Sequence, residues 1–309
     1  MADMKKFIIR LIVFFAVMLM LDRAFGLTMD YILTHAKGGL AKHRNYILNQ
    51  SYEDILIFGS SRALHHYNPQ IIQDSLHMSC LNCGVEGMGM PMFYGWWNVI
   101  KERYTPKIII YEVLPKYDYY RSEDNHKYLG ILKEQYDKPG IVEVFNRIDK
   151  NEYYKMMSYL YRYNSRFLQI IQDFLHPMTS TGDKGFVPIE GEFDPMLTQL
   201  AEKNNINNSM EIDSLKASFI QSFVKSVKQY DELRLFFVIS PVWYDQPLGN
   251  TEWLQKVCKR NNVPLIDYSS DVKYVHNDKY FKDGVHLNSL GADEYTRDLI
   301  RRIREYIGY

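Results

Sequence analysis

The sequence has few cysteines and no excess of charge of either sign. Three cysteines in 309 residues cannot build the dense disulfide framework that stabilises many small secreted domains. Lysine plus arginine and aspartate plus glutamate number 37 each, so the chain lacks a basic field, and no nucleic-acid partner is expected. No internal repeat or low-complexity tract is evident.

The cysteines are also too few for a metal or redox centre built on two pairs. Cys80 and Cys83 have the spacing of one such pair, but the sequence holds no second pair. They are expected to be small core residues, with a disulfide between them as the alternative. Neither a metal site nor a cofactor is therefore predicted.

At the amino end, an apolar segment is present but is interrupted by charge. Leu11 to Leu21 is free of charge, yet crossing a bilayer takes about 20 residues. Counted from Phe7 to Leu27, with Arg10 reaching toward the lipid headgroups, the segment becomes long enough. Residues 1–27 are therefore predicted to be an uncleaved signal anchor, with a cleaved signal peptide second and a buried soluble helix third.

The remainder of the chain is expected to lie outside the cytoplasm. Only six residues precede the apolar segment that begins at Phe7. So short a leader favours export of the residues beyond the segment, and the domain is therefore predicted on the extracytoplasmic, periplasmic side of the cell membrane. Residues 28–51 are expected to form a polar helical stalk, and residues 52–309 the domain. That domain is expected to fold without residues 1–27.

Five short apolar segments predict the strands of one sheet. They lie at residues 55–58, at Leu81 and beyond, and at 107–111, 233–239 and 264–266. Their alternation with helical segments predicts an α/β fold, a three-layer α/β/α sandwich with a five-stranded parallel sheet. Residues 115–230 are too many for one crossover and predict a helical insertion. Ten of the 25 tyrosines lie between residues 117 and 163, where they either pack the insertion onto the domain or line a substrate groove.

A serine follows the first predicted strand. Gly59 ends the strand, and Ser60 and Ser61 then lie at its carboxyl end, where ligands bind in open α/β sheets. A serine on a tight turn led by glycine is accessible to a substrate carbonyl. The alternative is a plain strand-to-helix turn with a serine cap. His65 and His66 come next, and each is expected to be packed or solvated, with substrate binding as the alternative.

An aspartate and a histidine three residues apart occur near the carboxyl end. Asp283 and His286 share one short turn in which Gly284 permits tight geometry. A serine hydroxyl becomes a good nucleophile when an imidazole takes its proton, and a carboxylate fixes the tautomer of that imidazole. The spacing therefore favours a catalytic site made of Ser61, His286 and Asp283, against the alternative of a surface loop with an incidental histidine.

These segments resemble the blocks of the SGNH/GDSL hydrolase superfamily, in the order of that family. Residues 59–61 resemble its first block, residues 82–87 its second and residues 283–286 its last. The resemblance implies a flavodoxin-like fold, Ser61 as nucleophile, His286 as base and Asp283 as its orienting carboxylate. It also implies the backbone N–H groups of Ser61 and Gly87 as oxyanion donors. The third block departs, because Glu112 and Val113 stand where the family has an asparagine donor, and losing one such donor costs about a hundredfold or more in rate.

The resemblance implies a serine esterase or O-acyltransferase that acts on O-acyl, above all acetyl, groups. The expected location favours a cell-envelope polysaccharide as the acylated partner, with a membrane acyltransferase as a further partner. The missing asparagine favours an alternative, a catalytically degenerate binding or scaffold protein of a glycan-modification complex. A lipid or thioester hydrolase is the third interpretation.

Overall fold

A single sheet of five parallel strands organises the protein. The computed structural model describes residues 2–121, 124–176, 184–199, 210–245 and 248–308. The strand order is β2-β1-β3-β4-β5, and the bounds are β1 (Ile55–Gly59), β2 (Cys80–Asn82), β3 (Ile108–Glu112), β4 (Arg234–Ile239) and β5 (Leu265–Asp267). The predicted α/β class and five-stranded parallel sheet are confirmed.

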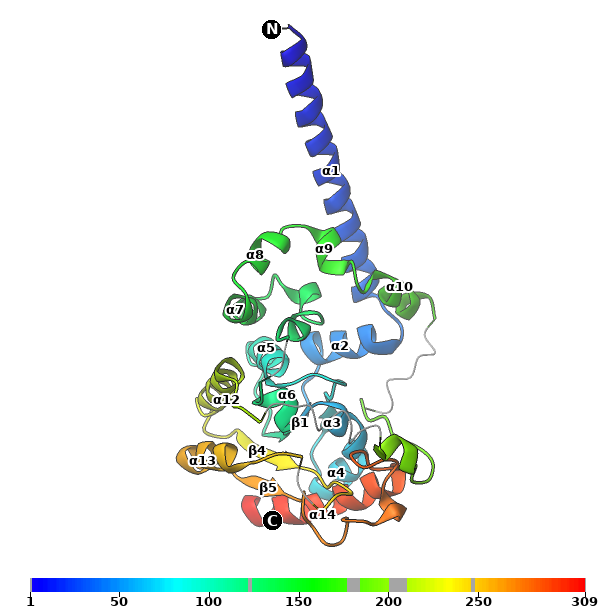
Figure 1. The fold of residues 1–309 in the computed structure, drawn as a ribbon, viewed down its shortest axis with the longest axis vertical. Coiled ribbons are helices and arrows are strands. Elements are labelled where there is room, and N and C mark those ends of the chain that lie inside the picture. Colours follow the sequence, from blue (N-terminus) through cyan, green and yellow to red (C-terminus); the bar gives the residue numbers. More distant parts are fainter. Residues whose placement is uncertain (1, 122–123, 177–183, 200–209, 246–247, 309) are drawn as a thin grey trace.

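Both faces of the sheet are covered, which explains why the strands are continuously apolar rather than alternating. Successive side chains of a strand point to opposite faces. Leu56 and Phe58 accordingly enter one core, and Ile55 and Ile57 enter the other. The first core is covered by α5 (Met90–Ile100), α12 (Ser214–Val227) and α13 (Glu252–Asn261), and the second by α3 (Ser61–His66), α4 (Pro69–Leu76) and α14 (Ser289–Ile307). The result is a three-layer arrangement (Figure 1).

Short helices fill much of the connection between β3 and β4. They are α6 (Pro115–Asp118), η1 (His126–Leu129), η2 (Lys133–Gln135), α7 (Pro139–Ile148), α8 (Glu152–Lys155), α9 (Tyr159–Tyr163) and α10 (Phe167–Leu175). Tyr119 and Tyr128 are buried in the core of the domain, whereas Tyr153 and Tyr154 of α8 are exposed. Of the two predicted roles for these tyrosines, packing therefore applies to the buried members.

The amino-terminal helix α1 (Ala2–Thr34) projects from the body, as Figure 1 shows. Its base is fixed to α9 through Asp22, whose carboxylate accepts the Ser158 hydroxyl at 2.7 Å and the backbone N–H groups of Tyr159 and Leu160 at 3.0 and 2.9 Å. After α1, the helix α2 (Gly39–Asn49) packs on the body and buries Ile47 and Leu48 in the first core.

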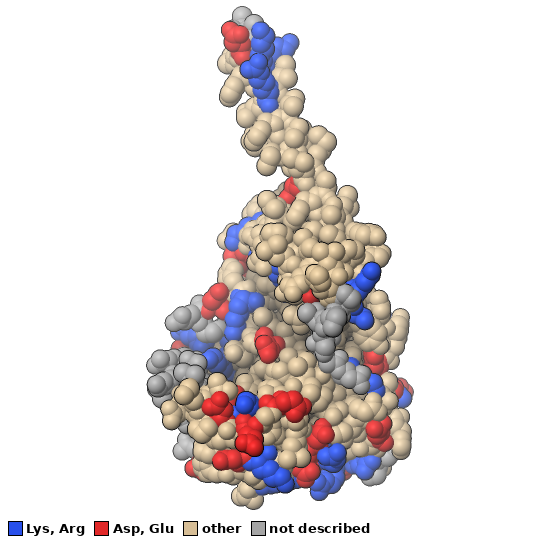
Figure 2. Space-filling view, turned by 90° about the vertical axis from the view of Figure 1, so that its right-hand side faces the viewer, with Lys and Arg blue, Asp and Glu red and all other residues tan. Residues whose placement is uncertain are grey.

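Large apolar side chains cover the projecting part of α1, and Lys and Arg gather at its free tip (Figure 2). Within the described residues, no helix is both long enough and apolar enough to cross a membrane, so the predicted signal anchor is not supported. The physical reason is that charged residues, Arg10 and Asp22, bound the uncharged apolar segment. Leu11 to Leu21 spans only about 16 Å as a helix, against about 30 Å of hydrocarbon core. Asp22, the next residue, is bound to α9.

The three cysteines are buried and free, as expected of small core residues. Cys80 and Cys83 lie on and just after β2, and burial raises the pKa of each thiol. The alternative disulfide between them is not present.

Candidate active site

Ser61 owes its position to a backbone turn that requires glycine. Gly59 ends β1 with φ +141°, and a Cβ at this position would lie 2.7 Å from the backbone oxygen of Glu112 on the neighbouring strand. The chain then turns at once into α3, of which Ser61 is the first residue. The serine therefore stands at the carboxyl edge of the sheet, half-buried, where the loops that leave the strands converge.

The structure brings Ser61, His286 and Asp283 into one hydrogen-bonded chain. Ser61 Oγ lies 3.0 Å from His286 Nε2. On the other side of the ring, His286 Nδ1 lies 2.9 Å from Asp283 Oδ2. Asp283 is itself held in place, because its Oδ1 accepts the backbone N–H groups of Val285 and His286 at 2.8 and 2.9 Å.

The electrostatics of Asp283 suit an orienting carboxylate. Burial raises its pKa, but the hydrogen bond and charge interaction with His286, together with two backbone N–H donors, outweigh burial and leave the pKa below its ordinary value. An ionised Asp283 fixes the proton of His286 on Nδ1 and leaves Nε2 free to accept from Ser61. This arrangement is chemically able to generate a serine nucleophile.

The two predicted oxyanion donors are the backbone N–H groups of Ser61 and Gly87. Within the described residues, neither the Ser61 N–H nor the Gly87 N–H has a protein acceptor. Gly87 has φ +69°, and a Cβ added to it would meet no atom within 4 Å, so the loop is open at this point. The oxyanion role of both groups remains a prediction.

Glu112 occupies the place of the missing asparagine, at the end of β3, and it faces the interior. It is fully buried and pairs with Arg62 at 3.1 Å. Its carboxylate also accepts the Ser240 hydroxyl at 2.9 Å and the Tyr67 hydroxyl. Burial raises the pKa of Glu112, and Arg62 and the hydroxyl donors oppose that rise. A carboxylate that accepts these bonds supplies no oxyanion donor.

Both histidines that follow Ser61 are packed, as expected. His65 Nδ1 lies 2.6 Å from the Val187 carbonyl, and its Nε2 lies 3.2 Å from Glu86, the residue before Gly87. His66 is completely buried and contacts Ser240 and Leu287. One signal of this network was present in the sequence, because Ser240 follows an apolar strand at the edge where Ser61 stands.

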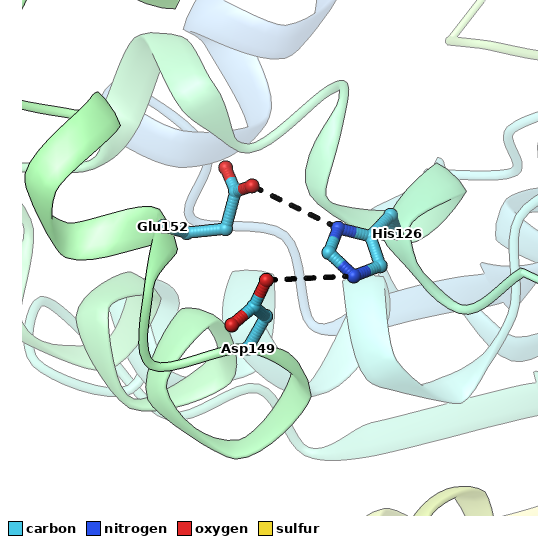
Figure 3. A group of neighbouring side chains, drawn as sticks. All are labelled: His126, Asp149 and Glu152. Atoms are coloured by element: carbon cyan, nitrogen blue, oxygen red, sulfur yellow. Dashed lines mark ion pairs between the residues drawn. The ribbon is translucent and has the colours of Figure 1, made fainter.

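His126, Asp149 and Glu152 form another cluster, in the insertion (Figure 3). His126 lies 3.7 Å from Asp149 and 3.8 Å from Glu152, as expected for loose ion pairs. Glu152 already pairs with Lys155 at 2.6 Å and accepts the Tyr161 hydroxyl at 3.1 Å. These partners account for the buried carboxylate, so the cluster carries no argument for a metal.

The fold and these contacts define a parallel α/β protein with a hydrogen-bonded serine, histidine and aspartate at the carboxyl edge of its sheet. No protein-family model matches the sequence, and no curated protein matches it. Among solved structures, the crystal structure of a "putative acylhydrolase" from Bacteroides fragilis NCTC 9343 is similar, with a TM-score of 0.40 and 12% sequence identity over 86% of this chain and 97% of that chain. A likeness at this level assigns no family.

Proposed function

We propose that the protein is a serine-dependent esterase or O-acyltransferase of the SGNH/GDSL type. The observation that carries the proposal is the Ser61–His286–Asp283 geometry, with both hydrogen bonds at 3.0 Å or less. Within the described residues, the backbone N–H groups of Ser61 and Gly87 have no protein acceptor, which supports acyl chemistry because such donors can stabilise the oxyanion of a tetrahedral intermediate. The motif blocks that resemble the superfamily support the same assignment.

Covalent labelling of the serine tests the proposal directly. A fluorophosphonate probe reacts with activated serines, so we expect it to modify wild-type protein at Ser61, with peptide mapping to locate the adduct. The adjacent Ser60 provides the matched control. Its hydroxyl is buried and has no partner among the described residues, so Ser60→Ala should label normally. Persistent labelling of Ser61→Ala, or failure of folded wild-type protein to label, would contradict the proposal.

Transfer to an acceptor is proposed ahead of simple hydrolysis, with an O-acylated cell-envelope glycan as the substrate. Glu112 supports this, because it stands where the family has an asparagine donor and itself only accepts hydrogen bonds. An oxyanion hole without that donor should stabilise the oxyanion formed from a small ester poorly. Nitrophenyl acetate should therefore be cleaved slowly, with deacylation accelerated by an acceptor oligosaccharide in a burst assay. Rapid hydrolysis that no acceptor changes would identify a plain esterase.

Glu112 also favours a second candidate, a glycan-binding or scaffold protein without catalysis. Under that function the Ser61–His286 contact has no catalytic role. Folded protein would then bind oligosaccharides in calorimetry while labelling no faster than Ser61→Ala. The two candidates therefore give opposite results with the same protein.

Association with a membrane is proposed for the amino-terminal helix, with the domain on the extracytoplasmic side. The exposed apolar side chains of Phe7 to Leu21 support this, because exposed surfaces of that kind mark contacts with an apolar partner. Lys5, Lys6 and Arg10 add charge suited to anionic headgroups. Flotation with vesicles that contain phosphatidylglycerol, compared with neutral vesicles, tests the lipid contact. Protease accessibility in intact cells tests on which side of the membrane the domain lies.

A further inference from the structure

A second group of polar side chains lies beneath the Ser61–His286 contact and is sealed from solvent. Arg62 and His66 come from α3, Glu112 ends β3, and Ser240 follows β4; none is more than 1% exposed. Burial of such groups is costly unless every one of them is hydrogen bonded. Their placement at the edge of the sheet that carries Ser61 and His286 therefore calls for a physical reason.

The direction of the hydrogen bonds that link Leu287, His66, Ser240 and Glu112 follows from chemistry alone. The Leu287 backbone N–H can only donate, and it meets His66 Nε2 at 3.1 Å, so that nitrogen carries no proton. The ring proton must then sit on Nδ1, which donates to Ser240 Oγ at 2.8 Å. The Ser240 hydroxyl in turn donates to Glu112 Oε1 at 2.9 Å.

The surroundings of His66 keep its ring in this neutral form. Burial lowers the pKa of His66 well below its usual value, and the charges of Arg62, His286 and His65 lower it further. The His66 ring stands edge-on to the His286 ring, with centroids 6.2 Å apart. His66 thus lies directly beside the imidazole that contacts Ser61.

We propose that His66 is a positioning residue for the serine chemistry: by accepting the Leu287 N–H, it fixes the backbone next to His286 and holds that imidazole on Ser61. This inference rests on the proposed function. The six-residue helix α3 begins with Ser61 and ends with His66, so one rigid element carries the serine and the group that anchors its base. A base displaced by about 1 Å costs on the order of 100-fold in rate.

Two variants test the two hydrogen bonds of His66 separately, the one to Leu287 and the one to Ser240. In His66→Gln the side-chain oxygen reaches the position of Nε2 and accepts the Leu287 N–H. In His66→Asn the amide nitrogen reaches the position of Nδ1 and donates only to Ser240. Fluorophosphonate labelling of Ser61 should proceed within about threefold of wild type in His66→Gln and at least about tenfold more slowly in His66→Asn. With an ester substrate, the loss should appear in kcat and leave KM unchanged.

Ser226→Ala is the control for general loss of stability. Its buried hydroxyl accepts the Trp97 indole N–H at 2.9 Å on the opposite face of the sheet. It should lower the melting temperature without slowing labelling. The positioning role is wrong if His66→Asn labels at the wild-type rate. It is also wrong if Ser226→Ala, at the same melting temperature as His66→Asn, slows labelling by the same factor.

A measurement independent of activity separates this inference from the proposed function. In protein with ¹⁵N-labelled histidine, the Nδ1 proton that His286 shares with Asp283 should give a downfield NMR resonance. We expect this resonance in wild type and His66→Gln, and its shift or loss in His66→Asn. If wild type fails to label but the resonance follows this pattern, positioning stands and the proposed function fails. An unchanged resonance in His66→Asn overturns positioning, whatever the labelling shows.

Discussion

Two clusters in this molecule contain a serine, a histidine and a carboxylate, and they are connected in different orders. In the half-buried cluster His286 lies in the middle, between Ser61 and Asp283. In the buried cluster Ser240 lies in the middle, between His66 and Glu112. Residue types alone therefore do not distinguish a reactive serine from a structural one.

The order of connection decides what each serine proton does. The lone pair of His286 Nε2 faces the Ser61 hydroxyl, so this ring is placed to take the proton. In the buried cluster His66 presents its proton to Ser240, whose own proton points to Glu112. The first arrangement suits nucleophilic catalysis, and the second suits a fixed scaffold beneath it.

The largest expected effect concerns the half-buried cluster. Ser61→Ala and His286→Ala should each reduce ester turnover by at least about 10⁴-fold, because the groups act as a unit. For the same reason the double variant should be little worse than either single variant. Steady-state assays of folded protein provide the measurement. Losses that multiply in the double variant would show that the two residues act independently.

Breaking the buried cluster should affect stability most. Glu112→Gln leaves the buried guanidinium of Arg62 without its ion-pair partner, so the free energy of unfolding should fall by about 3 to 5 kcal/mol. Urea denaturation followed by circular dichroism measures this loss. Removing both charges in Arg62→Met with Glu112→Gln should cost less than the sum of the single changes. Strict additivity would mean that the pair carries no coupling.

The contribution of Asp283, the carboxylate of the half-buried cluster, to the free energy of unfolding should depend on pH in the acid range. The pKa of Asp283 is lowered in the folded state, so its ionised form stabilises the fold above its unfolded pKa. That contribution disappears as the pH falls through the folded pKa, which lies below the ordinary 3.8. The stability difference between wild type and Asp283→Asn should therefore shrink as the pH falls from about 4 toward 2. A difference that grows over this acid range would contradict the assigned direction.

The smallest effect is expected at the exposed edge of the site. The Glu86 side chain that pairs with His65 is 70% exposed, so Glu86→Gln should cost less than about 1 kcal/mol of unfolding free energy. Labelling of Ser61 should change by less than about threefold. A loss as large as that of Glu112→Gln would show that the Gly87 loop depends on this pair.

Local pattern predicted much of the fold, because a strand buried on both faces must be apolar throughout. The segments at residues 55–58, 107–111 and 233–239 each correspond to an observed strand, and their parallel order follows from the helices between them. The motif spacing also anticipated that Ser61, Asp283 and His286 meet. Their catalytic roles stay predictions.

The sequence places Ser240 at the edge of the sheet, but the contacts of the buried cluster and those at the base of α1 could not be predicted, for a shared reason. Ser240 and His66 are 174 positions apart in the sequence, and only the order of the strands brings them together. Burial of an ion pair such as Arg62–Glu112 has no signature in composition. The anchor was predicted from the local apolar segment and its flanking residues, whereas the contacts of Asp22 depend on the distant helix α9.

Those contacts of Asp22 make α1 a structural part of the body rather than a detachable leader. The first backbone N–H groups of a helix need acceptors, and helices usually obtain one from the residue just before them. For α9 two such bonds come from α1, while Met29 and Leu33 of α1 join Tyr163 and Ile170 in a small core of their own. A protease cut after residue 27 would thus remove a cap as well as a tail. The contacts of α1 with the body thus include Asp22, which lies inside the segment predicted to be the anchor.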